Sequence, residues 1–170
     1  MKTKLVLIFS ILIVIGCNTS KKSIDSNIMD ESLFVEVINN NKMKSIADTQ
    51  ETADKHYIIK VPKSIKTTAS ISGGSFIRIM EFENQQQIIT VYEPYSELKI
   101  DEELLNVSYK EYKSTTDKLN LYDLEDVKLL KNRRFGVQLL DNHFIIMYLN
   151  IKKENVKYYN YSITSLVFKN

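Results

Sequence analysis

Apolar residues are distributed in two ways along this chain, as one continuous run near the start and as shorter alternating segments after residue 55. The run, Leu5–Ile15, is interrupted only by Ser10 and follows Lys2 and Lys4. This order of charged and apolar residues is typical of a secretory signal peptide. A membrane-spanning helix needs about 20 apolar residues, so the run is too short to cross a bilayer.

Alternation of apolar and polar side chains predicts three strands in the next part of the chain. His56–Val61 alternates in this way, and Pro62 ends the segment because proline cannot donate to a strand ladder. Phe76–Phe82 and Ile88–Tyr92 are two further strands. The polar residues Glu83–Gln87 between them predict a hairpin.

The last third of the chain predicts a second hairpin and a short final strand. Val127–Leu140 and Phe144–Ile151 are its two strands, joined by Asp141–His143. Phe144–Leu149 is apolar on both faces, so we expect it at the centre of a sheet, covered on each side. Ser165–Phe168 predicts a strand at a sheet edge.

A first helix is predicted after residue 100. Asp101–Glu103 supplies an N-cap and acidic residues for the positive end of the helix dipole. Leu105, Tyr109 and Tyr112 then recur at the intervals of a buried helical stripe. A strand over Val107–Lys113 is the alternative.

A second helix is predicted near the end, where Lys153–Ser162 would pack Val156, Tyr159 and Ile163 inward. Ser32–Ile38 fits both helical spacing and the composition of a strand, so its conformation stays open.

The resulting order is strand, hairpin, helix, hairpin, helix and short strand. Antiparallel neighbours therefore dominate. We expect an α+β fold, a mainly antiparallel sheet of about five to seven strands with one or two helices packed on a face.

The end of the apolar run carries the most specific motif of the chain. Val14, Ile15, Gly16 and Cys17 resemble the lipobox of bacterial lipoproteins, in which aliphatic and small residues precede a cysteine. The resemblance implies signal-peptidase recognition of residues 14–16, diacylglyceryl transfer to the Cys17 sulfur, cleavage before Cys17 and acylation of the new amine. Two or three acyl chains anchor a protein stably in a lipid bilayer. The alternative is an ordinary secretory signal followed by a free cysteine.

The expected cleavage divides the chain into four parts. Residues 1–16 are the signal peptide, residues 17–30 the lipidated N-terminus with a flexible polar tether, residues 31–54 an ambiguous connecting segment, and residues 55–170 a single α+β domain. Cleavage leaves 154 of the 170 residues, which suffices for one domain.

The folded part also carries a family resemblance. Tyr57–Lys63, the two central hairpins and a terminal helix running into Ser165–Lys169 resemble the PsbP/Mog1-like domain over about residues 55–169. Related domains serve as photosystem accessory subunits, binding modules and uncharacterised lipoproteins. The resemblance therefore implies a fold but no particular activity, and it supplies no catalytic residue.

Charge and cysteine content exclude some classes of function. Of 23 basic residues, Lys2 and Lys4 belong to the signal, which leaves 21 against 21 acidic residues. A net charge near zero provides no electrostatic attraction for nucleic acid. Cys17 is the only cysteine, so its lipidation would leave none for a disulfide.

Residues that could carry out chemistry are few. His56 and His143 are the only histidines and belong to no metal-binding spacing. No serine lies in a nucleophile-elbow motif. Glu81 and Glu83 fit the solvated face of a sheet better than a catalytic pair. We therefore expect no catalytic site, no metal and no cofactor, and we do not predict an enzyme.

Tyrosine is the main bias in composition, with ten residues and no tryptophan. Tyrosines favour interfaces because they bury area and keep a polar tip, but the simpler alternative is that they replace tryptophan at the edge of the core. The candidates for an interface or ligand face are Tyr92, Tyr95, Tyr148, Tyr158 and Tyr159.

These patterns predict a bacterial envelope lipoprotein, held in the lipid bilayer by acylated Cys17, with a non-catalytic domain that binds an envelope protein or supports an assembly. The alternative is a periplasmic lipoprotein that binds a small ligand on a concave, tyrosine-lined sheet face. Asn18, in place of an aspartate after the cysteine, favours the outer membrane, and Lys21 with Lys22 favours the side facing the periplasm.

Overall fold

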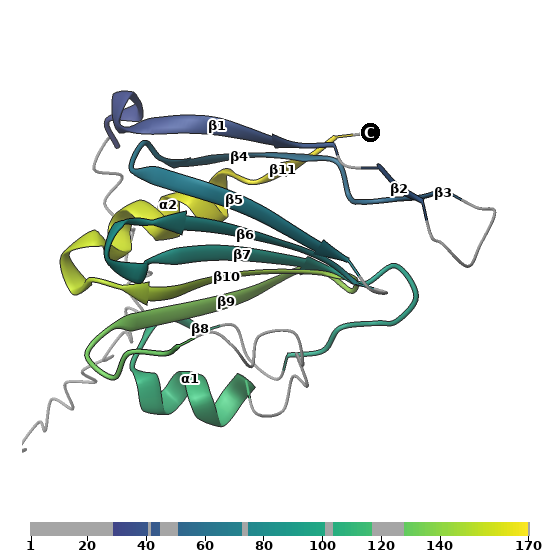
Figure 1. The fold of residues 1–170 in the computed structure, drawn as a ribbon. Coiled ribbons are helices and arrows are strands. Elements are labelled where there is room, and N and C mark those ends of the chain that lie inside the picture. Colours follow the sequence, from purple (N-terminus) through teal and green to yellow (C-terminus); the bar gives the residue numbers. More distant parts are fainter. Residues whose placement is uncertain are drawn as a thin grey trace, which may run out of the picture.

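The computed structural model describes residues 29–40, 42–44, 51–72, 75–100, 104–116 and 128–169. Within these residues, the strands form a six-stranded sheet, a three-stranded sheet and a two-stranded hairpin, and two α-helices pack beside them (Figure 1). All strand pairs are antiparallel, which confirms the expected α+β class. Among the same residues, no helix has the length and apolar character needed to cross a membrane.

The large sheet has the strand order β5-β6-β7-β10-β9-β8. Its strands are β5 (Ile65–Ser72), β6 (Phe76–Phe82), β7 (Gln87–Tyr92), β8 (Leu104–Val107), β9 (Arg134–Asp141) and β10 (Phe144–Ile151). The pairs β6–β7 and β9–β10 confirm the two predicted hairpins. The first strand of the second hairpin begins at Arg134 rather than at Val127, because a turn precedes Arg134; Val127 lies outside the described residues.

β10 is the centre of the hydrophobic core. It lies between β7 and β9, and all eight of its residues are buried. Successive side chains of a strand point to opposite faces, so β10 contributes to two apolar layers. One layer contains Phe144, Ile146 and Tyr148, and the other contains Ile145, Met147 and Leu149. The predicted central strand, covered on both sides, is confirmed.

The small sheet consists of β1 (Phe34–Asn39), β4 (Tyr57–Pro62) and β11 (Val167–Phe168), in the order β1-β4-β11. A 3-10 turn, Glu31–Leu33, precedes β1. The segment whose conformation the sequence left open is therefore a short turn followed by a strand. Tyr57, Ile59 and Val61 of β4 are buried on one face, as the alternation predicts, and β11 is an edge strand.

The residues between β1 and β4 form more structure than a polar connection. β2 (Lys42–Lys44) pairs with β3 (Glu51–Ala53). Asn39 at the end of β1 is fully buried, and its amide donates to Asp54 Oδ2 at 2.6 Å. β1 therefore belongs to the folded body, although the sequence assigned residues 31–54 to a connecting segment.

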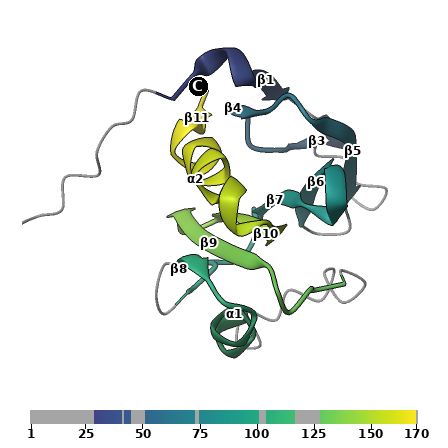
Figure 2. The ribbon, with the colours of Figure 1, turned by 90° about the vertical axis from the view of Figure 1, so that its left-hand side faces the viewer.

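Helix α2 (Val156–Ser165) lies between the small and the large sheet (Figure 2). Its buried residues Val156, Tyr159 and Ile163 join the apolar layer formed by β4 and β10, as predicted. The Ser165 hydroxyl accepts a hydrogen bond from the Lys60 backbone N–H at 3.0 Å. It thereby satisfies a backbone donor of β4 that lies beyond the residues paired with β11.

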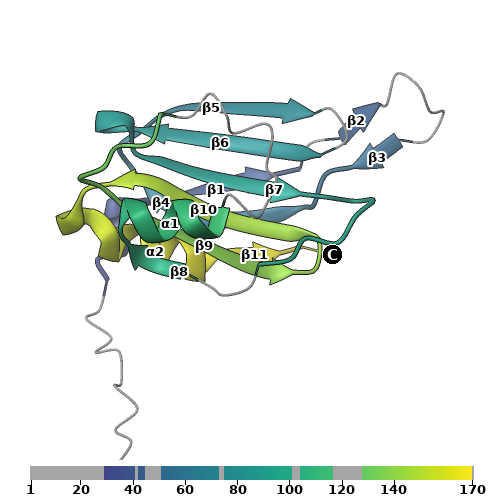
Figure 3. The same ribbon diagram turned by 90° about the horizontal axis from the view of Figure 1, so that it is seen from below.

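Helix α1 (Tyr109–Thr116) packs against the other face of the large sheet, near β8 and β9 (Figure 3). Tyr112 is buried there and stacks on Phe135, with ring centroids 4.9 Å apart. The second apolar layer therefore lies between this helix and the sheet.

The predicted start of the first helix is wrong. Asp101–Glu103 lies outside the described residues, and the following residues form β8. Leu105, assigned to the buried stripe, is 39% exposed, and Asn106 has a φ of 59°, which no right-handed helix contains. The helix begins after Ser108, whose backbone N–H donates to Glu111 Oε2 at 2.7 Å and whose hydroxyl accepts the Glu111 N–H at 3.4 Å. This reciprocal pair is a capping box.

β5 is a strand that the sequence analysis did not predict. It is an edge strand of the large sheet, and the side chains of residues 66–70 are exposed. An edge strand of mostly polar residues lacks the apolar alternation by which a half-buried strand is recognised.

Candidate ligand pocket

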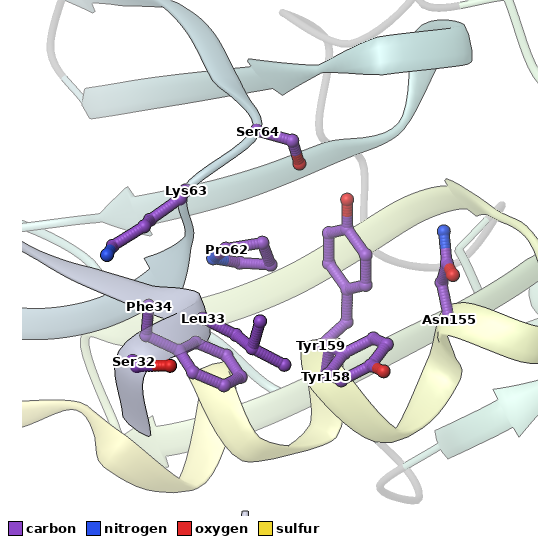
Figure 4. A pocket seen from close by; sticks show the side chains of 9 residues that line it. All are labelled: Ser32, Leu33, Phe34, Pro62, Lys63, Ser64, Asn155, Tyr158 and Tyr159. Atoms are coloured by element: carbon purple, nitrogen blue, oxygen red, sulfur yellow. The ribbon is translucent and has the colours of Figure 1, made fainter. Parts of the chain in front are cut away.

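A pocket opens where the 3-10 turn Glu31–Leu33, the start of β1, the turn after β4 and the start of α2 meet (Figure 4). Its volume is about 360 Å³, within the range of small-ligand sites. The lining residues are Ser32, Leu33, Phe34, Pro62, Lys63, Ser64, Asn155, Tyr158 and Tyr159.

One wall of the pocket follows from the pairing of β1 with β4. The antiparallel register places Phe34 opposite Pro62, and the Lys63 backbone N–H donates to the Leu33 carbonyl at 3.0 Å. Asp30 caps the 3-10 turn Glu31–Leu33 by accepting the Ser32 N–H at 2.9 Å. Residues from the beginning of the fold and from the end of β4 thus meet at one place.

The opposite wall comes from α2. Tyr158 packs toward Phe34, with ring centroids 6.2 Å apart. Tyr159 points deeper, where it meets Phe82 edge-to-face at 5.3 Å and Tyr148 at 6.2 Å. Consecutive helical residues therefore supply one side wall and the floor of the same pocket.

A buried glutamine holds the beginning of α2 in place. Gln86 is 3% exposed, and its Oε1 accepts hydrogen bonds from the Lys152 N–H at 3.1 Å and from Asn155 Nδ2 at 3.0 Å. Its Nε2 donates to the Glu83 carbonyl at 3.0 Å. The Asn155 side chain that lines the pocket is thus fixed from behind by the β6–β7 connection.

The Tyr159 hydroxyl is the most unusual polar group of the pocket. The side chain is 2% exposed, and within the described part of the chain its hydroxyl has no hydrogen-bond partner. In Figure 4 the hydroxyl points up from the floor into the space below Ser64. Burial raises the pKa of Tyr159 above its ordinary value, so at neutral pH the group is a protonated donor directed into the pocket.

The rim of the pocket carries a positive charge. Lys63 is exposed there, and none of the nine lining residues is acidic. Hydrogen bonds with Ser32, and more weakly the attraction of Lys63, hold the pKa of Asp30 below its usual range. Asp30 is therefore a carboxylate at neutral pH, directed toward its cap.

An exposed ionic contact ties the 3-10 turn to the rest of the fold. Glu31 Oε1 accepts from Lys60 Nζ at 2.9 Å and from the Tyr161 hydroxyl at 3.1 Å. The same two partners hold the pKa of Glu31 below its usual range. Residues of β4 and α2 thus meet at the turn that forms one edge of the pocket.

Tyr148, a candidate for an exposed face, lies in the core instead. Its side chain is fully buried, and its hydroxyl accepts the Asn106 backbone N–H at 2.6 Å. The ring lies across Gly136 of β9, where a Cβ atom would be only 2.4 Å from the ring carbon Cζ. Its burial leaves no surface for a ligand or partner, so the candidate role is wrong for this residue.

Tyr92 and Tyr95 lie at the other end of β7 from the pocket. Tyr92 is half-buried, packs on Phe76 with ring centroids 5.9 Å apart, and has Lys55 Nζ 5.7 Å from its ring centroid. Tyr95 is 73% exposed. The five candidate tyrosines therefore do not share one face, and only Tyr158 and Tyr159 line the pocket.

The remaining lining residues were not candidates from the sequence. They come together because β1 pairs with β4, and because α2, which follows β1 by more than one hundred residues, packs beside both strands. No local motif marks such a site. The neighbouring tyrosines at 158 and 159, one directed sideways and one inward, were the only usable signal.

His143 and Glu81, two of the residues considered for chemistry, have structural partners. His143 Nδ1 lies 2.9 Å from the Glu93 carbonyl and 3.0 Å from that of Ser96, which holds the ring in its turn. Glu81 accepts from Thr67 and Gln87 of the neighbouring strands. Among the described residues, no three His, Cys, Asp or Glu side chains are grouped so that they could hold a metal ion.

The expected anchor residues, Val14, Ile15, Gly16 and Cys17, lie outside the described residues. The lipid anchor and the resemblance to the PsbP/Mog1-like domain therefore stay predictions. No protein-family model, curated protein or solved structure matches this chain.

Proposed function

We propose that this chain is a lipid-anchored protein of the bacterial cell envelope whose folded domain is a non-catalytic module that binds a small ligand. The binding role rests on one observation, the Tyr159 hydroxyl that points from the floor into the pocket. The anchor is supported by the apolar run Leu5–Ile15 and by the lipobox-like residues that end at Cys17.

The two parts of the proposal are connected by the position of the pocket. Asn18–Asp30 separates Cys17 from the first turn of the fold, and fully extended it spans at most about 45 Å. Ser32 and Leu33, which line the pocket, follow this tether directly. A ligand would therefore be bound close to the membrane surface, by our proposal on the periplasmic side of the outer membrane.

Cys17→Ser tests the anchor. The variant lacks the sulfur that would accept the diacylglyceryl group, so we expect it to leave the membrane fraction and to lack the mass of the lipid. Thr19→Ser, two residues further on, is the matched control and should remain anchored. Membrane association of Cys17→Ser at wild-type level, with an unchanged intact mass, would contradict the anchor.

Blocking the pocket tests the binding role. Leu33 lines the pocket and is 45% exposed, so Leu33→Trp fills the entrance without disturbing a buried position. Leu105→Trp is the control, because Leu105 is similarly exposed at 39% but lies on β8. A small-molecule screen of the full-length protein should give ligands that raise its melting temperature, since a ligand stabilises the state it binds. These ligands should lose their effect on Leu33→Trp only; ligands insensitive to both variants would refute the pocket.

A protein partner that pairs with β1 is the second candidate. β1 is an edge of the small sheet, and Val35 and Ile38 on it are 38% and 53% exposed. Exposed edge strands of this kind are templates for an added strand. This candidate corresponds to the envelope partner expected from the sequence.

Crosslinking in intact cells separates the two candidates. Val35→Lys places a charge on the β1 edge and should abolish a crosslink that depends on strand addition, whereas Leu105→Lys on β8 should not. A partner captured equally by both variants, or no reproducible partner, would count against the second candidate.

A further inference from the structure

The deepest polar group of the pocket is a donor without an acceptor. The Tyr159 side chain is 2% exposed, and its hydroxyl has no hydrogen-bond partner among the described residues. The oxygen itself keeps some contact with solvent, so a bound acceptor would replace water as its hydrogen-bond partner. The position of the hydroxyl therefore favours a ligand that carries an oxygen acceptor near the floor of the pocket.

The other polar groups of the pocket are already engaged or lie at its rim. Asn155 Nδ2 donates one of its two hydrogens to Gln86 Oε1 at 3.0 Å, which fixes the amide at the wall of the pocket. Lys63 is exposed at the rim, and in Figure 4 its side chain extends away from the Tyr159 hydroxyl. No cation therefore accompanies the hydroxyl at the floor.

The remaining wall is mostly apolar. Leu33, Phe34, Pro62 and the rings of both tyrosines surround the space, which holds about 360 Å³. At ordinary packing densities, a ligand of about a dozen non-hydrogen atoms fits this volume. The pocket is thus a half-open, mostly apolar groove with the Tyr159 hydroxyl at its floor.

We infer that the pocket takes a small neutral molecule with an apolar body and one carbonyl oxygen, which accepts a hydrogen bond from the Tyr159 hydroxyl. A carbonyl requires only a donor, whereas a ligand hydroxyl would bring a second group that needs an acceptor. This inference rests on the proposed function, because it names the ligand class for the same pocket.

A carboxylate fits the floor less well than a carbonyl. Burying a charge beside a neutral hydroxyl, without a paired cation, is far less favourable than burying a neutral acceptor. The positive rim at Lys63 does not change this preference, because its side chain extends away from the floor. The ligand class is therefore set by charge as well as by shape.

Three probes of nearly equal size separate the contributions of the apolar body, the carbonyl oxygen and a negative charge to binding. Benzylacetone carries an aromatic ring and one carbonyl, butylbenzene lacks only the oxygen, and hydrocinnamate carries a carboxylate instead. Each is titrated into the purified full-length protein in nonionic detergent, and dissociation constants are measured by NMR. The variants are Tyr159→Phe, which removes the donor, and Tyr92→Phe at the other end of β7, which serves as a matched control.

The inference predicts a specific pattern of affinities. Benzylacetone should bind the wild type about three- to tenfold more tightly than it binds Tyr159→Phe, the range expected for one net hydrogen bond. Butylbenzene should bind both proteins equally, and Tyr92→Phe should match the wild type with every probe. Hydrocinnamate should bind more weakly than benzylacetone.

The outcomes that overturn the inference differ from those that overturn the proposed function. Equal binding of benzylacetone to the wild type and to Tyr159→Phe, or tighter binding of hydrocinnamate, would refute the neutral carbonyl class while leaving a ligand pocket. If no probe bound with a dissociation constant below about 1 mM, the pocket itself would be refuted as a small-ligand site.

Discussion

Removing the Tyr148 hydroxyl and removing the Tyr159 hydroxyl should have different effects on the free energy of unfolding, although both rings lie in the same core. Tyr148 and Tyr159 lie in one apolar layer, with ring centroids 6.2 Å apart, and both are almost completely buried. The Tyr148 hydroxyl accepts the Asn106 N–H at 2.6 Å, whereas the Tyr159 hydroxyl points into the pocket. Tyr148→Phe and Tyr159→Phe therefore change the same atoms in different surroundings.

The expected magnitudes follow from this difference. Tyr148→Phe deprives a backbone N–H of its acceptor and should lower the free energy of unfolding by about 0.5–1.5 kcal/mol. Tyr159→Phe removes a hydroxyl that has no partner among the described residues and whose oxygen keeps some solvent contact, so stability should change by less than about 0.5 kcal/mol. The rings remain in both variants, and packing should therefore change little.

Urea denaturation of the full-length protein, followed by circular dichroism, measures both values under one condition. The slope of unfolding free energy against urea should be the same for the two variants, because each exposes the same surface on unfolding. A loss of stability in Tyr159→Phe equal to that in Tyr148→Phe would refute the reasoning, since it would mean that the Tyr159 hydroxyl is bonded within the protein.

Three further predictions concern the core and the junction between the sheets. Gly136→Ala should lower the free energy of unfolding by about 1–3 kcal/mol or more, because the new Cβ would lie 2.4 Å from the Tyr148 ring; denaturation with urea measures it, and a neutral effect would contradict the close contact. Stability should fall between about pH 10 and pH 12, because burial raises the pKa of Tyr57 to about 12, so the unfolded state releases its proton first as the pH rises. Tyr57→Phe should reduce this alkaline slope, which thermal melts across the pH range measure. Asn39→Ala should lower the free energy of unfolding by about 2–3 kcal/mol, because it removes the bonds to Asp54 and the Lys55 carbonyl and the acceptor of Arg78; a loss in chemical denaturation below about 0.5 kcal/mol would contradict this.

Hydrophobic patterning was sufficient for the parts of the fold that it directly controls. Phe144–Leu149 is apolar at every position, and a strand of this composition has to be covered on both faces. Val156, Tyr159 and Ile163 recur at helical intervals, and all three are buried in α2. In both segments burial alone determines the structure.

Patterning failed where local hydrogen bonds or a sheet edge decided the conformation. The helix α1 begins at a capping box formed by Ser108 and Glu111, a signal present in the sequence but outweighed by the acidic residues before it. Asn106 reverses the backbone just before this helix with a φ of 59°. β5 is polar because an edge strand buries little, and it therefore resembles a loop.

The pocket was the least predictable feature. It depends on β1 meeting β4 and on α2 meeting both, and these contacts join Phe34 to Pro62 and to Tyr158 across most of the folded chain. Of the five tyrosines selected by composition, two line the pocket. Composition could not distinguish them from Tyr148, because a tyrosine in the wall of a pocket and a tyrosine in the closed core are the same residue type.

Contacts between a bound probe and the protein test the central claim most directly. We propose intermolecular NOE measurements between benzylacetone and the full-length protein. The account predicts contacts from the probe to Phe34, Pro62 and Tyr158. Contacts to Tyr95 or to α1 instead, with none at the pocket, would contradict it.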